Sequence, residues 1–182
     1  KIIERTEEII KTAEELAEFR DKVNTPLTYE GKIVKLGRDI DLSSICGENV
    51  NGEEISWVPI GYFKGTFDGD NHTISNIYVK SNKAYQGLFS VVNGAVIKNI
   101  VIENSIIEGK FCVGIIGDSA NSLIENIHTT KNNTIKATTA NEIGCMVGGI
   151  VGCTNSTTIS KVSNSATVIG NGWYVGGIVG LL

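Results

Sequence analysis

The sequence lacks a basic cluster and a long apolar run. Lys and Arg number 16 against 20 Asp and Glu, the formal net charge is −4, and the basic residues are scattered along the chain. A protein without a basic patch has little attraction for a phosphate backbone, so nucleic acid is not expected as a partner. No apolar run approaches the roughly 18 residues that cross a bilayer, and membrane insertion is therefore not expected either.

Signatures of common catalytic centres are also missing. His72 and His128 do not belong to an H-E-x-x-H motif, and no C-x-x-C pair occurs. Neither a metal centre nor a cofactor is therefore predicted. The motifs G-x-S-x-G, P-loop and G-x-G-x-x-G are absent as well, so acyl transfer and nucleotide chemistry have no sequence support.

Four cysteines, Cys46, Cys112, Cys145 and Cys153, are interpreted as small apolar residues that fill a core. An extended strand of eight residues would separate Cys145 from Cys153 by about 26 Å, beyond the reach of a disulfide. A bond between Cys112 and Cys145, in neighbouring repeats, is left open.

A four-residue word recurs along the second half of the chain. It reads GIIG at 114–117 and GIVG at 149–152 and 177–180, with GLFS at 87–90 as a looser first copy. The defining glycines are Gly87, Gly114, Gly117, Gly149, Gly152, Gly177 and Gly180. The copies are 27, 35 and 28 residues apart, so the unit is about 27 residues with one eight-residue insertion.

A second word follows the first three copies at a fixed distance of ten residues, as IKNI at 97–100, IENI at 124–127 and ISKV at 159–162. Self-similarity at this period is typical of solenoids, in which each unit stacks on the next. From Gly31 onward the chain has short β-branched runs separated by Gly, Asn, Asp and Ser. We therefore predict an all-β fold, a parallel β-helix over 31–182 with roughly five coils, in which Ile97, Ile124 and Ile159 share one column.

A single helix is predicted at 12–24. Thr12 and Glu15 form a capping box, and Leu16, Phe19 and Val23 follow at helical spacing. We expect residues 1–30 to form an N-terminal helical cap that covers the apolar end of the first coil. Residues 7–11 are either a short strand or the tail of a preceding segment.

Three asparagines occupy similar places in their repeats. Asn99 and Asn126 each stand third in the second word, and Asn76 has the same place in Ile74-Ser75-Asn76-Ile77. Stacked amides can form a hydrogen-bonded ladder along the axis. These asparagines are therefore predicted to be structural, with Lys161 interrupting the series.

The repeat words resemble the GLUG repeat of large secreted or wall-attached bacterial proteins. The resemblance extends upstream to DIDLS at 39–43, WVPIG at 57–61 and GTFDG at 65–69. It implies a right-handed parallel β-helix that serves as a stalk or adhesive region of an extracellular or cell-surface protein, in the bacterial cell wall, and carries no known catalytic residues. The chain begins without Met and stops inside a repeat word, so we interpret it as a fragment whose partners include the rest of a longer chain.

The strongest candidate site is the cluster Asp68, Asp70, Asn71 and His72. Its carboxylates could bind calcium or cleave a glycosidic bond as acid and base. The twelfth residue of an EF-hand loop that starts at Asp68 would have to be Glu, but it is Val79. The sequence therefore does not match the EF-hand motif. The favoured interpretation is a glycine-containing turn whose side chains hold their own backbone.

Several aromatic residues fall in predicted loops and strand edges, where rings could stack on sugars. They are Trp57, Tyr62, Phe63, Tyr78, Tyr85, Trp173 and Tyr174. The predicted function is a non-enzymatic structural or adhesive module, with a host glycan or host protein as the candidate ligand. The alternative is a carbohydrate-binding or polysaccharide-degrading β-helix, an analogy from fold alone.

Overall fold

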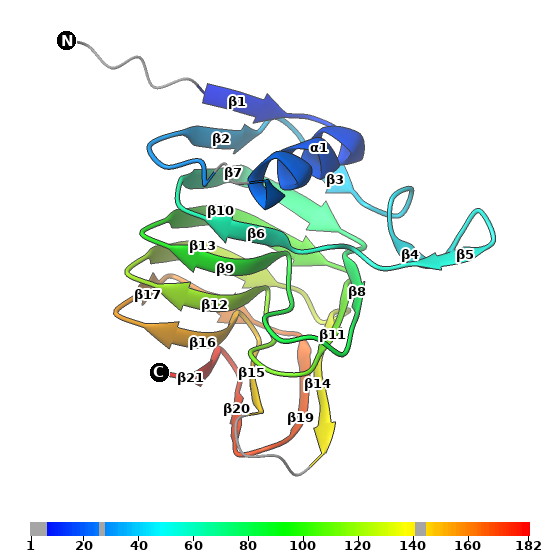
Figure 1. Ribbon diagram of the computed structural model, residues 1–182, viewed down its shortest axis with the longest axis vertical. Coiled ribbons are helices and arrows are strands. Elements are labelled where there is room, and N and C mark those ends of the chain that lie inside the picture. Colours follow the sequence, from blue (N-terminus) through cyan, green and yellow to red (C-terminus); the bar gives the residue numbers. More distant parts are fainter. Residues whose placement is uncertain (1–6, 26–27, 141–144) are drawn as a thin grey trace.

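Strands from successive repeats lie side by side in parallel sheets, seen edge-on as stacked arrows in Figure 1. The computed structural model describes residues 7–25, 28–140 and 145–182. Sheet 1 consists, in spatial order, of β1 (Glu7–Ile10), β2 (Ile33–Leu36), β7 (Thr66–Ser75), β10 (Val96–Glu103), β13 (Leu123–Thr129) and β17 (Thr158–Ser160). The short strands β3 (Ile40–Asp41) and β18 (Ser163–Asn164) pair with β7 and β13.

Two further parallel sheets complete the stack. Sheet 2 contains β6 (Ile60–Phe63), β9 (Phe89–Asn93), β12 (Ile116–Ala120), β16 (Val151–Asn155) and β21 (Val179–Leu181). Sheet 3 contains β8 (Tyr78–Lys80), β11 (Ile106–Gly109), β14 (Thr134–Ala140) and β19 (Thr167–Asn171). The chain runs from sheet 2 to sheet 1 to sheet 3 and then returns to sheet 2 one level further along, as in β9, β10, β11 and β12.

Smaller pairings lie beside these sheets. β15 (Met146–Gly148) pairs with β20 (Tyr174–Gly176) in parallel. β4 (Gly47–Val50) and β5 (Glu53–Ile55) form an antiparallel hairpin that projects from the side of the stack (Figure 1). The described part of the chain is thus nearly all β with one helix, in agreement with the predicted all-β class.

The register of sheet 1 confirms that equivalent repeat residues stack. Ile97 pairs with Ile124, and Ile124 pairs with Ile159. On its other side Ile97 pairs with Phe67, and Phe67 pairs with Val34. Side chains alternate along a strand, so these residues point inward into one continuous hydrophobic core. Each fully buried member contributes roughly 1.5–3 kcal/mol relative to exposure, before chain entropy is subtracted.

The predicted helix is present as α1 (Ala13–Asn24), with Thr12 as its N-cap. The Thr12 hydroxyl accepts a hydrogen bond from the Glu15 amide at 3.1 Å. The Glu15 carboxylate accepts one from the Lys11 amide at 2.6 Å, not from the predicted Thr12 amide. The buried Phe19 ring lies 5.8 Å from the rings of Phe63 and Phe67. Residues 7–10, left open between strand and tail, form β1.

The eight-residue insertion is concentrated at one corner of the stack. Gly109 pairs with Ala137, whereas Val113 bridges Val147. Most of the extra residues therefore lie between Ala137 and Val147, a stretch that includes the undescribed residues 141–144. Sheets 1 and 2 keep their stacking on both sides of it.

One disulfide crosses between coils, which corrects the interpretation of all four cysteines as core fillers. Cys112 is bonded to Cys153, with Cα atoms 5.3 Å apart, and the open alternative with Cys145 is not the pair formed. Cys46 and Cys145 are free and buried. The turn that contains Cys112 folds back over β16, so a Cβ on Gly152 would overlap Cys112 backbone atoms. Linear spacing did not reveal this contact because it depends on the path of a turn.

Candidate functional site

The cluster predicted from sequence lies at a bulge in the middle of β7. Asp68 pairs with Lys98 and His72 with Ile100, so three residues of β7 oppose one residue of β10. Asp70 and Asn71 have φ angles of 52° and 67°, a left-handed conformation that Asp and Asn tolerate better than most residues. Asp68 Oδ1 accepts a hydrogen bond from the Asp70 amide at 2.9 Å. Asp68 thus holds the backbone of its own segment, as the favoured interpretation expected, but the segment is a bulge within a strand and not a turn.

Each charged side chain of this bulge already has a partner. The Asp68 carboxylate accepts a hydrogen bond from Asn99 Nδ2 at 2.8 Å and lies 3.2 Å from Lys98 Nζ. Asp70 Oδ2 lies 3.2 Å from Lys35 Nζ. The structure therefore brings the four predicted residues together but engages them in contacts between coils. Within the described part of the chain, no three His, Cys, Asp or Glu side chains gather to hold a metal ion.

His72 is held by a residue that the sequence had not singled out. Its Nδ1 lies 3.1 Å from Asp39 Oδ1, and the same oxygen accepts a hydrogen bond from the Thr73 amide at 2.9 Å. Hydrogen bonds from the Thr73 amide and His72 lower the pKa of the exposed Asp39 carboxyl. Asp39 thus fastens the segment after β2 to β7.

A row of side-chain hydrogen bonds runs along sheet 1 from the bulge. Asn99 donates to Asp68, and Asn126 Nδ2 donates to Asn99 Oδ1 at 2.9 Å. His128 Nε2 lies 2.9 Å from Asn126 Oδ1, and its Nδ1 lies 2.7 Å from Ser163 Oγ. This amide row connects β7, β10, β13 and β18. His128, a residue of β13, is part of it.

Asn76 lies outside the amide row, contrary to the prediction. Its backbone amide donates a hydrogen bond to the carbonyl of Glu103, and its side-chain Nδ2 donates one to Asp41 Oδ1 at 2.7 Å. In the register of sheet 1, Ile100 pairs with His72 and Glu103 with Ser75, so Asn76 lies just beyond the end of β7, several residues along the strand direction from the place that corresponds to Asn99. Asn71 takes the place expected for it, because its Oδ1 accepts from Asn126 Nδ2 at 3.0 Å.

Two outward-facing carboxyl groups respond to their surroundings in opposite ways. Burial alone would raise the pKa of Asp68, but hydrogen bonds from Asn99 and the Asp70 amide, together with Lys98, outweigh it and lower the pKa. Burial raises the pKa of Asp118 on β12, which has no ion-pair partner in the described part of the chain. The fold therefore favours the ionised form of Asp68 and the neutral form of Asp118.

Replacing these two aspartates by asparagine should shift stability in opposite directions at pH 7. Asp68→Asn should lower the free energy of unfolding by about 1.5 kcal/mol, the lower range for a hydrogen bond to a charged group. Asp118→Asn should raise the melting temperature, because it removes a carboxylate that the fold disfavours. Thermal melts at pH 7 and pH 3 provide the measurement.

The sign of the pH dependence follows from linkage. The stabilisation by Asp68 is complete above its unfolded pKa, near 3.8, and is lost as the pH falls through the lower folded value. The destabilisation caused by the ionised Asp118 carboxylate appears as the pH rises above the same unfolded pKa. Both differences from wild type should therefore shrink at pH 3, and an Asp118→Asn variant that is less stable at pH 7 would contradict this assignment.

Outward side chains of alternating charge follow the stacking direction on two sheets. On sheet 1 the residues in order are Lys35, Asp68, Lys98, Glu125 and Lys161. Lys161 Nζ lies 2.8 Å from Glu125 Oε1. On and beside sheet 3 the residues are Glu54, Lys80, Glu108 and Lys136. We call these the charge rows; opposite charges one period apart would have revealed them in the sequence.

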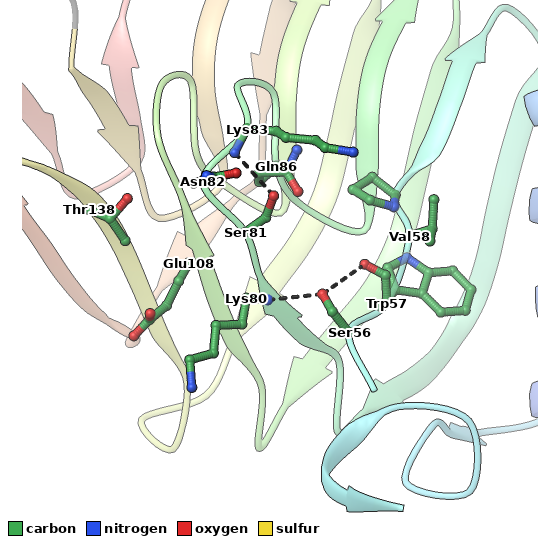
Figure 2. A pocket seen from close by; sticks show the side chains of 11 residues that line it. Ser56, Trp57, Val58, Lys80, Ser81, Asn82, Lys83, Gln86, Glu108 and Thr138 are labelled. Carbon is green, nitrogen blue, oxygen red and sulfur yellow. Dashed lines mark hydrogen bonds between the residues drawn. The ribbon is translucent and has the colours of Figure 1, made fainter. Parts of the chain in front are cut away.

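A hollow lies on the flank formed by sheet 3. This groove has a volume of about 690 Å³ and is lined by residues 56–59 and 80–83 with Gln86, Glu108 and Thr138. Figure 2 shows the two lining segments facing each other across the opening. Sequence reasoning missed the groove because its walls come from three repeats and from the segment that follows β5.

The 56–59 wall is anchored by a buried tryptophan. Trp57 is 1% exposed, its amide hydrogen-bonds to the Tyr78 carbonyl, and the Arg20 guanidinium lies 4.6 Å from its ring centroid. The Lys80 amide donates to Ser56 Oγ at 3.0 Å, drawn in Figure 2. The groove is therefore preformed, with Val58, 57% exposed, at its rim.

The aromatic residues expected on the surface divide into two groups. Trp57, Phe63 and Tyr78 are buried, whereas Tyr62, Tyr85, Trp173 and Tyr174 are exposed. The exposed rings come from different levels of the stack, and Tyr62 accepts a hydrogen bond from Asn93 Nδ2 at 2.8 Å. None of these exposed four lines the groove.

Comparison with known proteins found a relative in sequence and a solved structure with a similar fold. Over 153 residues the chain is 32% identical to halomucin from Haloquadratum walsbyi, a match that covers 79% of this chain and 2% of halomucin. A crystal structure described as "a putative immunoglobulin A1 protease from Bacteroides ovatus" superimposes with a TM-score of 0.59 at 18% identity. That match covers 98% of this chain and 62% of the other, and it shows a shared fold. No family model matches the chain.

Among the described residues, no helix has the length and apolar character needed to cross a membrane.

Proposed function

We propose that the chain is a right-handed parallel β-helix with GLUG-type repeats, and that it serves as a non-enzymatic stalk or adhesive module of a secreted or cell-surface protein. The observation that carries this proposal is the mutual pairing of outward charges in the charge rows. Carboxylates that could serve chemistry are instead used to join neighbouring coils. Residues 1–30 then act as the cap of the stack and residues 31–182 as its body.

Three further observations support a place outside the cell. Disulfides persist mainly in oxidising compartments, and Cys112–Cys153 joins two coils. The matched relative, halomucin, carries a mucin-type name, and the chain covers only 2% of it. A stack of similar coils, each paired with the next, is suited to a long, repetitive protein.

Surface exposure can be tested on intact cells of the source organism. An antibody raised against the purified 182-residue chain should label unpermeabilised cells or their culture medium, and brief external protease treatment should remove the cell-bound label. Pre-absorbing the antibody with the purified chain is the control. Labelling that requires permeabilisation would overturn the proposed location.

The non-enzymatic part of the proposal needs a separate assay. The purified chain, incubated with immunoglobulin A1 and with a panel of acidic and neutral polysaccharides, should yield no cleavage products by mass spectrometry. Turnover that is lost in the Asp68→Asn variant, while the fold is retained, would instead support the alternative of a degrading enzyme.

A further inference from the structure

We infer that the groove beside sheet 3 binds a short acidic oligosaccharide, with the Lys83 ammonium contacting a sugar carboxylate. This rests on the adhesive form of the proposed function and names its ligand class. The groove volume of about 690 Å³ falls within the roughly 300–1,000 Å³ typical of small-ligand sites.

The charge available to a ligand comes from Lys83. Lys80 Nζ is paired with Glu54 at 2.8 Å and Glu108 with Lys136 at 3.2 Å, so both are already neutralised within a charge row. Lys83 is exposed and has no ion-pair partner among the described residues. Figure 2 shows its side chain extending across the groove toward the wall that carries Val58. The site therefore presents one uncompensated positive charge.

Neutral hydrogen-bonding groups also line the groove. Ser81 Oγ accepts from the Lys83 amide at 3.1 Å, which leaves its proton free to donate. Asn82 is exposed, and no hydrogen bond engages its side chain within the described residues. Thr138 Oγ1 donates to the Gly109 carbonyl at 3.0 Å and can accept from a ligand. Such a mixture of donors and acceptors suits sugar hydroxyl groups.

The opposite wall offers an apolar surface held in place. Val58 and Pro59 supply carbon surface for the C–H faces of sugar rings, and buried Trp57 fixes their position. A rigid wall reduces the entropy lost on binding.

A peptide strand fits the groove less well. The Lys80 amide donates to Ser56 Oγ and the Ser81 amide to the Glu108 carbonyl. Because these backbone donors are occupied, the floor lacks the open sheet edge that strand addition requires.

Titration of the folded 182-residue chain with tetragalacturonate, followed by NMR chemical shifts at low ionic strength, tests the inference. Shifts should concentrate on residues 56–59 and 80–83. Lys83→Gln should weaken binding by about tenfold, as expected for losing one charge-assisted hydrogen bond. Lys131→Gln, which removes an exposed lysine elsewhere, is the matched control and should change affinity by less than about twofold, within the low range expected of an exposed charge.

Several outcomes would overturn the inference. They are equal weakening by both variants, shifts confined to other surfaces, equal binding of neutral maltotetraose, or equal binding of tetraglutamate. Thermal melts of both variants establish that they are folded. Absence of oligosaccharide binding with retained surface labelling would remove this inference and leave the stalk form of the proposed function intact.

Discussion

Gly149→Ala is expected to lower the free energy of unfolding by roughly 3 kcal/mol, the upper range for overpacking a closely packed interior. A Cβ at this position would overlap the Asn164 side chain and the carbonyl oxygen of Gly177 in the next coil. The backbone carbonyl cannot move aside without disturbing the pairing of Val151 with Val179. Urea unfolding, monitored by circular dichroism, measures the loss.

Gly177 provides a matched control for that experiment. It occupies the same place in the following repeat, yet a Cβ there meets nothing within 4 Å. Gly177→Ala should therefore leave stability within about 0.5 kcal/mol of wild type, as for most surface substitutions away from special features. Equal losses in the two variants would show that close approach between coils is not why Gly149 is glycine.

Removal of the disulfide should have the other large effect. In the chain-entropy model, a link between residues 41 positions apart stabilises the fold by roughly 4 kcal/mol through the unfolded state. The double variant Cys112→Ala and Cys153→Ala should unfold at correspondingly lower urea concentration. The measurement is the unfolding midpoint with and without dithiothreitol.

The reductant itself supplies the control. Dithiothreitol should destabilise the wild-type chain to the level of the double variant and should not change the variant. If the midpoint of the wild type is insensitive to full reduction, verified by counting thiols in the unfolded protein, the bond contributes little and the coils are held by packing alone.

The fold could be predicted from the sequence in the segments that contain the repeat words. Glycine spacing placed Ile97, Ile124 and Ile159 at equivalent positions, and the sheet register pairs them. The capping box located the start of α1 because the Thr12 hydroxyl acts over only three residues. Such features depend on local spacing, which a sequence displays directly.

Features that depend on a shift of register could not be predicted in the same way. Asn76 shares its local word with Asn99, but the sheet register places it beyond the end of β7, where it meets Asp41. The candidate residues Asp68 to His72 were found, whereas their partners Lys35, Asp39 and Lys98 come from neighbouring coils. Pairing of opposite charges one period apart was visible in the sequence and could have located part of this network.

The disulfide has a mechanical consequence. The backbone hydrogen bonds of the three sheets lie roughly along the long direction of the molecule, so tension between its two ends would peel the coils apart one after another. Cys112 and Cys153 belong to adjacent levels, and the covalent bond would halt this peeling between them. Under pulling, the segment between the two cysteines would stay closed while the coils on either side extend. The intact disulfide would therefore limit the length to which the chain can be stretched.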